Sequence, residues 1–319
     1  MEQIQRLAGL LRENVGRAIV GKDDAIELLL VALLADGHVL LEDVPGIGKT
    51  TLAKALARSL NCTFRRIQCS PDLTPSDVTG VSVYDQRGGV FVFHPGPIQA
   101  QIVLVDEINR ATPRTQSALL EAMEERQVTA EGETRPLPRP FLLLATQNPI
   151  ELEGTFPLPE AQLDRFLIRL RLGYPGEDDE HLMLARYRET APLASLDAVV
   201  EPDDLLAAQT ACRSIYVDAS VEAYLVRIVR ATRDHPLIEL GASPRATLAL
   251  YRAAQALAAV RGRAFVLPDD VKALAPVVLS HRLMLNTQAQ LRGRGGEQIV
   301  DEVLEQVPAP VEEAVAAPA

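Results

Sequence analysis

Aromatic residues and cysteines are scarce in this chain of 319 residues, and tryptophan is absent. Because aromatics make up only 4% of the residues, the core must be built mainly from Leu, Val, Ile and Ala, which favours helices packed on a sheet. The three cysteines, Cys62, Cys69 and Cys212, are odd in number and show no C-x-x-C spacing. A disulfide framework or a zinc site is therefore not expected, and we interpret all three as reduced and mostly buried.

The chain also lacks a long hydrophobic run and an excess of basic residues. Its longest strongly apolar run, residues 28–35, is far too short to span a bilayer. The N-terminal segment carries charges where a signal peptide needs its apolar stretch, so we expect a cytoplasmic protein without membrane insertion. The 43 acidic and 32 basic residues give a net charge of −11, which disfavours nucleic acid and anionic membranes as partners.

Strand and helix patterns alternate along the first half of the chain. Apolar residues at helical spacing predict helices over 2–17 and 25–35. The pattern then predicts strands over 38–42, 63–68, 102–105, 141–145 and 167–172, with helices between them. Such alternation is typical of an α/β fold with a doubly wound, parallel five-stranded sheet that binds ligands at the carboxyl ends of its strands.

The second half of the chain shows helical patterns only. We therefore predict an α/β core over residues 1–174, a smaller all-α lid domain over 175–307 and a disordered tail over 308–319. Two segments interrupt the alternation within the core and are predicted to be β-hairpins, 81–94 and 127–140. The alternating residues Val90 to Phe93 are more typical of a half-buried strand than of a loop that grips a substrate.

A glycine-rich segment after the first strand carries the clearest chemical signal. It nearly matches G-x-x-x-x-G-K-[ST], the phosphate-binding P-loop, with Asp43 where the first glycine normally stands. Gly46 and Gly48 would let the backbone approach phosphate, which faces the N–H groups of the next helix. Lys49 is expected to reach the β- and γ-phosphates, and Thr50 to bind Mg²⁺. The predicted nucleotide-binding residues here are Pro45, Gly46, Ile47, Gly48, Lys49, Thr50 and Thr51.

Polar residues also follow two of the later predicted strands. The aliphatic strand at 102–105 ends in Asp106 and Glu107, which we interpret as a support for Mg²⁺ and as the general base that polarises the attacking water. By themselves, two acids at a strand end are also compatible with a solvated turn or a helix cap. Asn148 ends the next strand, where its amide could orient water near the γ-phosphate, although Asn148-Pro149 alone would only indicate a turn.

Several long segments, in the same order along the chain, resemble the MoxR branch of the AAA+ ATPases. They are DEINRA (106–111), TQSALLEAMEE (115–125), ATQNP (145–149), GTFPLPEAQLDRF (154–166) and GASPRA (241–246). The resemblance covers nearly the whole chain except the tail. It implies a homo-oligomeric ring, a hexamer, that hydrolyses ATP with Mg²⁺ and remodels or activates partner proteins. Such partners often carry von Willebrand factor A domains, and the work is often complex maturation or metal insertion.

The same resemblance implies roles for residues that the motifs do not cover. Arg165 would be the arginine finger offered to the neighbouring subunit's γ-phosphate; otherwise it is a surface residue paired with an adjacent carboxylate. Arg245 would be the sensor-2 arginine, acting either in its own subunit or in the neighbour. Val20 and Gly21 would lie on the adenine side. The hairpins would be the helix-2 insert and the pre-sensor-1 hairpin, which face the pore of the ring or a partner.

Two other functions compete with the ring ATPase. A P-loop kinase for a small molecule fits the glycine-rich loop, but it does not explain Glu107 and Arg165. A DNA-directed AAA+ motor would fit the hairpins, but the net charge of −11 speaks against it.

Overall fold

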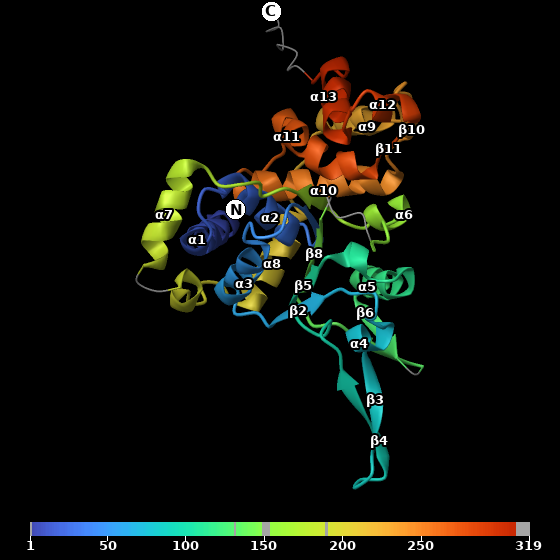
Figure 1. The fold of residues 1–319 in the computed structure, drawn as a ribbon. Helices are drawn as coiled ribbons and strands as arrows, with labels where there is room; N and C mark the ends of the chain where they lie inside the picture. Colours follow the sequence, from blue (N-terminus) through green and yellow to red (C-terminus); the bar gives the residue numbers. More distant parts are fainter. Residues whose placement is uncertain (1, 131, 149–153, 189–190, 311–319) are drawn as a thin grey trace, which may run out of the picture.

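The molecule is built on a five-stranded sheet whose strands all run parallel, in the order β2-β5-β8-β1-β9. This computed structural model describes residues 2–130, 132–148, 154–188 and 191–310. The predicted doubly wound α/β core with two hairpins and a C-terminal helical part is confirmed (Figure 1). No helix among the described residues is long and apolar enough to cross a membrane.

The described elements follow the alternation read from the sequence. The strands of the large sheet are β1 (Val39–Glu42), β2 (Phe64–Gln68), β5 (Ile102–Asp106), β8 (Leu142–Gln147) and β9 (Ile168–Leu170). The helices of the first half are α1 (Glu2–Ala18), α2 (Asp23–Leu34), α3 (Lys49–Ser59), α4 (Pro75–Thr79), η1 (Ile108–Arg110), α5 (Pro113–Glu125) and α6 (Glu160–Leu163). The helices of the second half are α7 (Glu177–Tyr187), η2 (Pro192–Ser195), α8 (Pro202–Cys212), α9 (Ala219–Ala231), α10 (Pro244–Val260), α11 (Pro268–Leu279), η3 (Ser280–Arg282), α12 (Thr287–Leu291) and α13 (Gly296–Gln306).

Alternate residues of each central strand enter two different hydrophobic cores, because successive side chains of a strand point to opposite faces. In β5, Ile102 and Leu104 join the core formed with α1, α2, α3 and the C-terminal helices. Val103 and Val105 join the other core, which contains α5 and α4. The strand is therefore buried on both faces, which explains its purely aliphatic sequence.

The second half is helical apart from one short ribbon. α10 packs across α2 and α1, so one continuous core joins the C-terminal helices to the sheet. The prediction of an entirely helical second half misses β10 (Ile238–Leu240) and β11 (Met284–Leu285), which pair antiparallel. Strands this short carry no periodicity to detect, and α11 already ends at Leu279, before β11. Most of the predicted tail, residues 311–319, lies outside the described residues.

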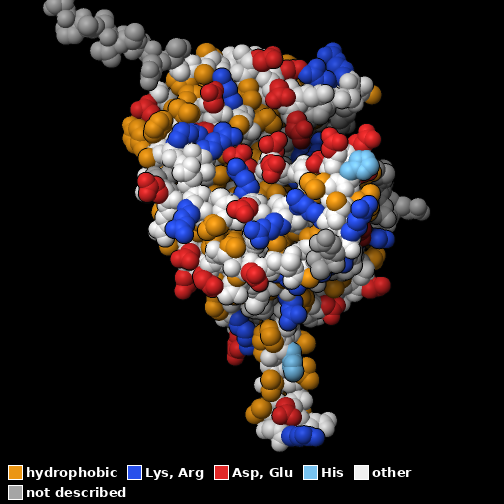
Figure 2. Space-filling model, turned by 90° about the vertical axis from the view of Figure 1, so that its left-hand side faces the viewer, with side chains coloured by type: hydrophobic (Ala, Val, Ile, Leu, Met, Phe, Trp, Pro, Cys, Tyr) orange, Lys and Arg blue, Asp and Glu red, His pale blue; other side chains and the backbone are white. Residues whose placement is uncertain are grey.

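Both predicted hairpins are present. β6 (Gln127–Ala130) pairs with β7 (Glu133–Pro136), and β3 (Gly80–Asp85) pairs with β4 (Val90–Pro95). The β3–β4 hairpin projects away from the body and presents hydrophobic side chains to solvent (Figures 1 and 2). The prediction that Val90 to Phe93 are half-buried is wrong for the outer part of the hairpin, where the side chain of Phe91 is 72% exposed. Among the described residues, no other helix or strand packs against this end of the ribbon (Figure 1).

Candidate nucleotide-binding site

The carboxyl ends of three adjacent strands bring the predicted ATP-binding residues together. β8 lies between β5 and β1, with Val105 opposite Ala145 and Gln147 opposite Glu42. The residues that follow each strand therefore meet at one edge of the sheet. They are the P-loop after β1, Asp106 and Glu107 at the end of β5, and Asn148 after β8. All of them, with the exception of Ile47 of the P-loop, line a cavity of about 360 Å³.

Two glycines with positive φ shape the P-loop. Gly46 has φ +86° and Gly48 has φ +95°, a conformation that residues with a side chain rarely adopt. Gly48 is the N-cap of α3, so the first N–H groups of this helix face the cavity as a site for an anion. Lys49 begins α3, and its ammonium donates to the Asp43 carbonyl at 2.7 Å. Partial burial lowers the pKa of Lys49, and nearby carboxylates, that of Asp106 first, oppose this shift.

Asp43, the residue that departs from the P-loop motif, has a structural task. Its buried carboxylate accepts hydrogen bonds from the backbone N–H groups of Leu172 and Gly173, the latter at 3.2 Å. These residues follow β9 and lead into α7. The start of the P-loop is thereby fixed to the connection between the sheet and the second half of the chain.

Thr146 organises the two acidic residues at the end of β5. Its hydroxyl donates to Oδ1 of Asp106 at 2.6 Å and accepts from the backbone N–H of Glu107 at 2.8 Å. Glu107 has φ +55°, a left-handed conformation that costs about 1–2 kcal/mol for a residue with a side chain. The bond from its N–H to Thr146 helps to hold this conformation. Thr146 is not among the residues predicted from the sequence, although it stands two residues before Asn148.

The carboxylate of Glu107 points between β2 and η1. Its Oε2 accepts from Gln68 Nε2 at 3.1 Å and from Arg110 Nη1 at 3.2 Å. Gln68 ends β2, directly opposite Asp106 in the sheet. Together with Arg66 it lines the cavity. Neither residue is predicted from the sequence, because only the pairing of β2 with β5 shows that they stand beside the acids.

The predicted metal-binding residues fit the ion that they would hold. Thr50 and Asp106 line the same cavity and offer a hydroxyl and a carboxylate, the oxygen ligands that Mg²⁺ prefers. A metal site that relied on the protein alone would need more ligands, and none of the described residues form a cluster of three or more His, Cys, Asp or Glu side chains. Mg²⁺ typically binds through one or two protein ligands together with the phosphates of a nucleotide, which agrees with this sparse set.

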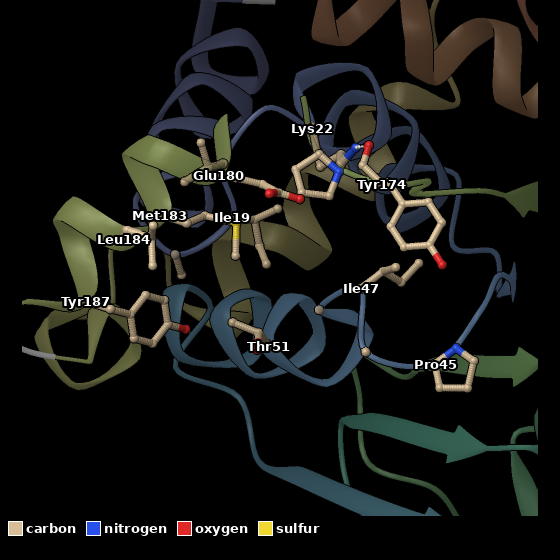
Figure 3. Close-up of a pocket in the computed structure, with 15 residues that line it drawn as sticks. Ile19, Lys22, Pro45, Ile47, Thr51, Tyr174, Glu180, Met183, Leu184 and Tyr187 are labelled. Carbon is tan, nitrogen blue, oxygen red and sulfur yellow. Dashed lines mark hydrogen bonds between the residues drawn. The ribbon is translucent and has the colours of Figure 1, made fainter. Parts of the chain in front are cut away.

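A second, larger cavity of about 550 Å³ extends from the P-loop to α7 (Figure 3). Val20, which is predicted to lie on the adenine side, lines it with the P-loop residue Ile47. On the opposite wall, α7 contributes Met183, Leu184 and Tyr187, whose side chains face the P-loop side. Apolar and aromatic walls of this kind suit a flat base. The α7 residues were missed because the sequence placed them in a separate lid.

The connection before α7 holds this wall in place. Lys22 donates to the Tyr174 carbonyl at 2.8 Å (Figure 3). Gly21, with φ +68°, lies so close to α7 that an added Cβ would stand 1.9 Å from Oδ2 of Asp179. Gly21 does not line the cavity itself, but its lack of a side chain permits α7 to approach.

Arg165 and Arg245 lie elsewhere. Arg165 precedes β9, which runs parallel to β1 with their first residues paired. Arg165 therefore lies at the amino ends of the strands, whereas the P-loop follows the carboxyl end of β1. Both arginines contact Glu124 of α5. Arg245 donates a hydrogen bond to this carboxylate. Arg165 forms an ion pair with it, but the Nε–H of Arg165 does not point at the carboxylate and makes no hydrogen bond. The two side chains line one cavity with Glu124 and are absent from the lining of the P-loop cavity. The structure does not bring them to the phosphate site of their own chain.

Comparison with protein families agrees with this architecture. Residues 38–168 match the family described as "ATPase family associated with various cellular activities (AAA)", and residues 230–303 match the AAA lid domain. The first match contains the P-loop, both acids, Asn148 and Arg165; the second contains Arg245.

Individual relatives cover almost the whole chain. The uncharacterized protein YeaC of Bacillus subtilis is 50% identical over 98% of this chain and 97% of its own length. Chaperone MoxR1 of Mycobacterium tuberculosis is 44% identical over 95% of this chain and 82% of its own. The crystal structure of a putative ATPase from Cytophaga hutchinsonii superposes with a TM-score of 0.90 at 38% identity, covering 97% of this chain and 98% of that one.

Proposed function

Because this chain belongs to the MoxR family of AAA ATPases, we propose that it hydrolyses ATP in a homo-oligomeric ring and thereby remodels or activates partner proteins. The observation that carries the proposal is the division of the predicted catalytic residues between two edges of one sheet. The P-loop, the acids and Asn148 share one cavity, whereas Arg165 and Arg245 share another.

The predicted catalytic and metal-binding residues of the P-loop cavity each have a part in hydrolysis. ATP places its phosphates on the P-loop backbone, and Lys49 neutralises the β- and γ-phosphates. Thr50 and Asp106 would hold Mg²⁺, which would offset charge on the phosphates when it is bound. Glu107 accepts a proton from the attacking water, and Asn148 orients that water. The hydrogen bonds from Gln68 and Arg110 both engage Oε2 of Glu107, so Oε1 can take the proton without breaking either of them.

A second subunit completes the site. Four residues of a strand span about 13 Å, so Arg165 at the amino edge cannot reach the P-loop at the carboxyl edge of the same sheet. A neighbouring subunit can present this edge to the P-loop cavity. Arg245 shares Glu124 with Arg165, so both arginines act in the neighbour, where they stabilise charge that develops on the γ-phosphate.

The projecting hairpin supports a protein as the target of this motion. The outer residues of β3–β4 expose apolar side chains, among them Val83, Tyr84 and Phe91, on a ribbon outside the body (Figure 2). Exposed apolar surface of this kind marks sites that bind other proteins. The resemblance to the MoxR branch makes a von Willebrand factor A domain the favoured target, in complex maturation or metal insertion.

Subunit mixing tests the shared site. Lys49→Ala removes the phosphate contact, and Arg165→Ala removes the finger, so each protein alone should be inactive. If the site is shared, a mixture regains activity, because some interfaces combine an intact P-loop with an intact arginine. Wild-type activity per subunit should also rise with protein concentration. A mixture that stays inactive beside a concentration-independent wild type would contradict the ring, and turnover that requires a small acceptor would indicate a kinase.

A further inference from the structure

Asp106, the carboxylate predicted to support Mg²⁺, already forms an ion pair with a side chain of the protein, Arg66. Arg66, in the middle of β2, donates to Oδ2 of Asp106 from Nε at 3.1 Å and from Nη2 at 2.5 Å. The other oxygen of Asp106 accepts from Thr146. Both oxygens of the carboxylate are therefore engaged by side chains. This ion pair lies on the wall of the P-loop cavity, since both residues line it.

Arg66 is held there by side-chain contacts alone, since besides Asp106 its guanidinium donates only to Oε1 of Gln68, at 2.7 Å, among the described residues. Its side chain is 47% exposed, whereas that of Asp106 is 15% exposed. A guanidinium and a divalent cation repel each other, so they cannot both stay close to Oδ2. Phosphate is a strong alternative partner for arginine, because its oxygens match the planar donor fork. A nucleotide in the cavity would offer that partner within reach of the same side chain.

We propose that Arg66 competes with Mg²⁺ for Asp106 and turns to the nucleotide phosphates when the metal binds. Without metal, Arg66 neutralises Asp106 and adds positive charge to the phosphate site. When Mg²⁺ is bound, Arg66 releases Oδ2 of Asp106 and remains close to the phosphates. Arg66 thereby sets the Mg²⁺ concentration at which the nucleotide is fully bound. The inference rests on the proposed binding of ATP and Mg²⁺.

The chain offers a matched control for the removal of this charge. Arg65 precedes Arg66 on the same strand, is exposed, and points to the opposite face of the sheet. It does not line the P-loop cavity. Arg65→Gln and Arg66→Gln therefore change the net charge equally, but only the second removes the partner of Asp106.

The test measures binding of a fluorescent, non-hydrolysable ATP analogue, first in EDTA and then at rising Mg²⁺. For Arg66→Gln we expect about two- to five-fold weaker binding in EDTA and a half-saturating Mg²⁺ concentration lower by a similar factor, as for loss of a partly exposed ion pair. Arg65→Gln should match the wild type in both. Damage to the fold would weaken both kinds of binding, so the opposite signs distinguish competition from misfolding.

Three results would overturn the inference. Arg66→Gln could need more Mg²⁺ than the wild type, which would make Arg66 a support of the metal site. Equal shifts in Arg65→Gln and Arg66→Gln would show a long-range effect of charge. Failure of the wild-type protein to bind the analogue under any condition would remove the proposed function together with this inference.

Discussion

Gly21 and Asp179 are in such close contact that a methyl group on Gly21 would lie 1.9 Å from the Asp179 carboxylate. Gly21 follows α1, and Asp179 lies in the first turn of α7, so this contact sets how near α7 stands to the P-loop. Residues of α7 form one wall of the larger cavity. The lack of a side chain at Gly21 thus contributes to the width of the site proposed for the base.

Gly21→Ala should therefore weaken nucleotide binding. The side chain would meet Asp179, and φ +68° would strain any residue other than glycine by about 1–2 kcal/mol. We expect ADP, titrated by calorimetry, to bind several-fold more weakly. Gly9→Ala in α1 is the control: nothing lies within 4 Å of its added Cβ, and alanine favours a helix. Unchanged ADP affinity in Gly21→Ala would show that the position of α7 does not matter for binding.

Glu124 positions the two arginines proposed to act in the neighbouring subunit. Its Oε2 lies 2.9 Å from Arg165 Nε, and its Oε1 lies 2.6 Å from Arg245 Nη2. Two guanidinium groups repel each other, and one carboxylate between them offsets that repulsion. Without this carboxylate, the two arginine side chains are expected to move apart and to lose their shared orientation.

Glu124→Gln should lower the ATPase rate several-fold at saturating protein while it leaves ADP affinity unchanged, because Glu124 does not line the P-loop cavity. Steady-state hydrolysis and calorimetry check the two expectations. Glu125→Gln, on the exposed neighbouring residue of α5, is the control with equal charge. A faster ATPase in Glu124→Gln would reverse the interpretation and make Glu124 a restraint on the arginines.

Asp43 should contribute to stability rather than to phosphate binding. Asp43→Ala would leave the N–H groups of Leu172 and Gly173 without their partner, at a cost of about 1–3 kcal/mol in the free energy of unfolding. Asp43→Gly, which restores the usual motif, should be as unstable as Asp43→Ala. Asp43→Asn keeps one oxygen and should lie between them and the wild type.

Urea denaturation measures these differences, with Asp72→Ala as an exposed control. If Asp43→Gly proved as stable as the wild type, the two hydrogen bonds would contribute nothing to the folded state.

The sequence predicts elements and motifs well where the signal is local. β5 is recognisable because a strand buried on both faces must be aliphatic throughout. Because parallel strands end at one edge, the motifs after β1, β5 and β8 could be expected to meet. β10 and β11 remained undetected because two or three residues show no period. The exposed end of the β3–β4 hairpin resembles a half-buried strand, since alternation alone does not show whether a surface is covered.

Contacts between distant segments were beyond the sequence. Arg66 meets Asp106 only because β2 pairs with β5, and no spacing along the chain indicates it. Likewise, Glu124 lies far along the chain from Arg245 and meets it only because the fold brings the start of α10 within reach of α5. Side-chain partners depend on which strands are neighbours and on how helices cross, so they follow from the fold rather than from a motif.

A buried histidine should make the stability of the fold depend on pH. His38 lies before β1 and accepts from the Leu143 N–H through Nδ1 at 3.0 Å, while Nε2 contacts the Met123 carbonyl at 3.1 Å. This arrangement fits the neutral ring with its proton on Nε2. Burial, and secondly the charge of Arg126, lowers the pKa of His38 from 6.5 to about 3. The folded protein therefore keeps this ring neutral where the unfolded chain binds a proton.

The sign of the pH effect follows from that difference. Above pH 6.5 both states are neutral at His38 and its contribution is complete; as pH falls toward 3, the unfolded chain is favoured by about 1.4 kcal/mol per pH unit. Burial also lowers the pKa of His281, so a similar slope adds to the first. Urea denaturation between pH 7 and 4.5 should thus show that the free energy of unfolding falls as pH falls. In His38→Gln this slope should be smaller than in the wild type by the contribution of one proton, whatever the absolute stability of that variant. His94→Gln, on the exposed hairpin, should keep the wild-type slope. Equal slopes in His38→Gln and the wild type would mean that His38 titrates normally in the folded protein, which its two backbone contacts argue against.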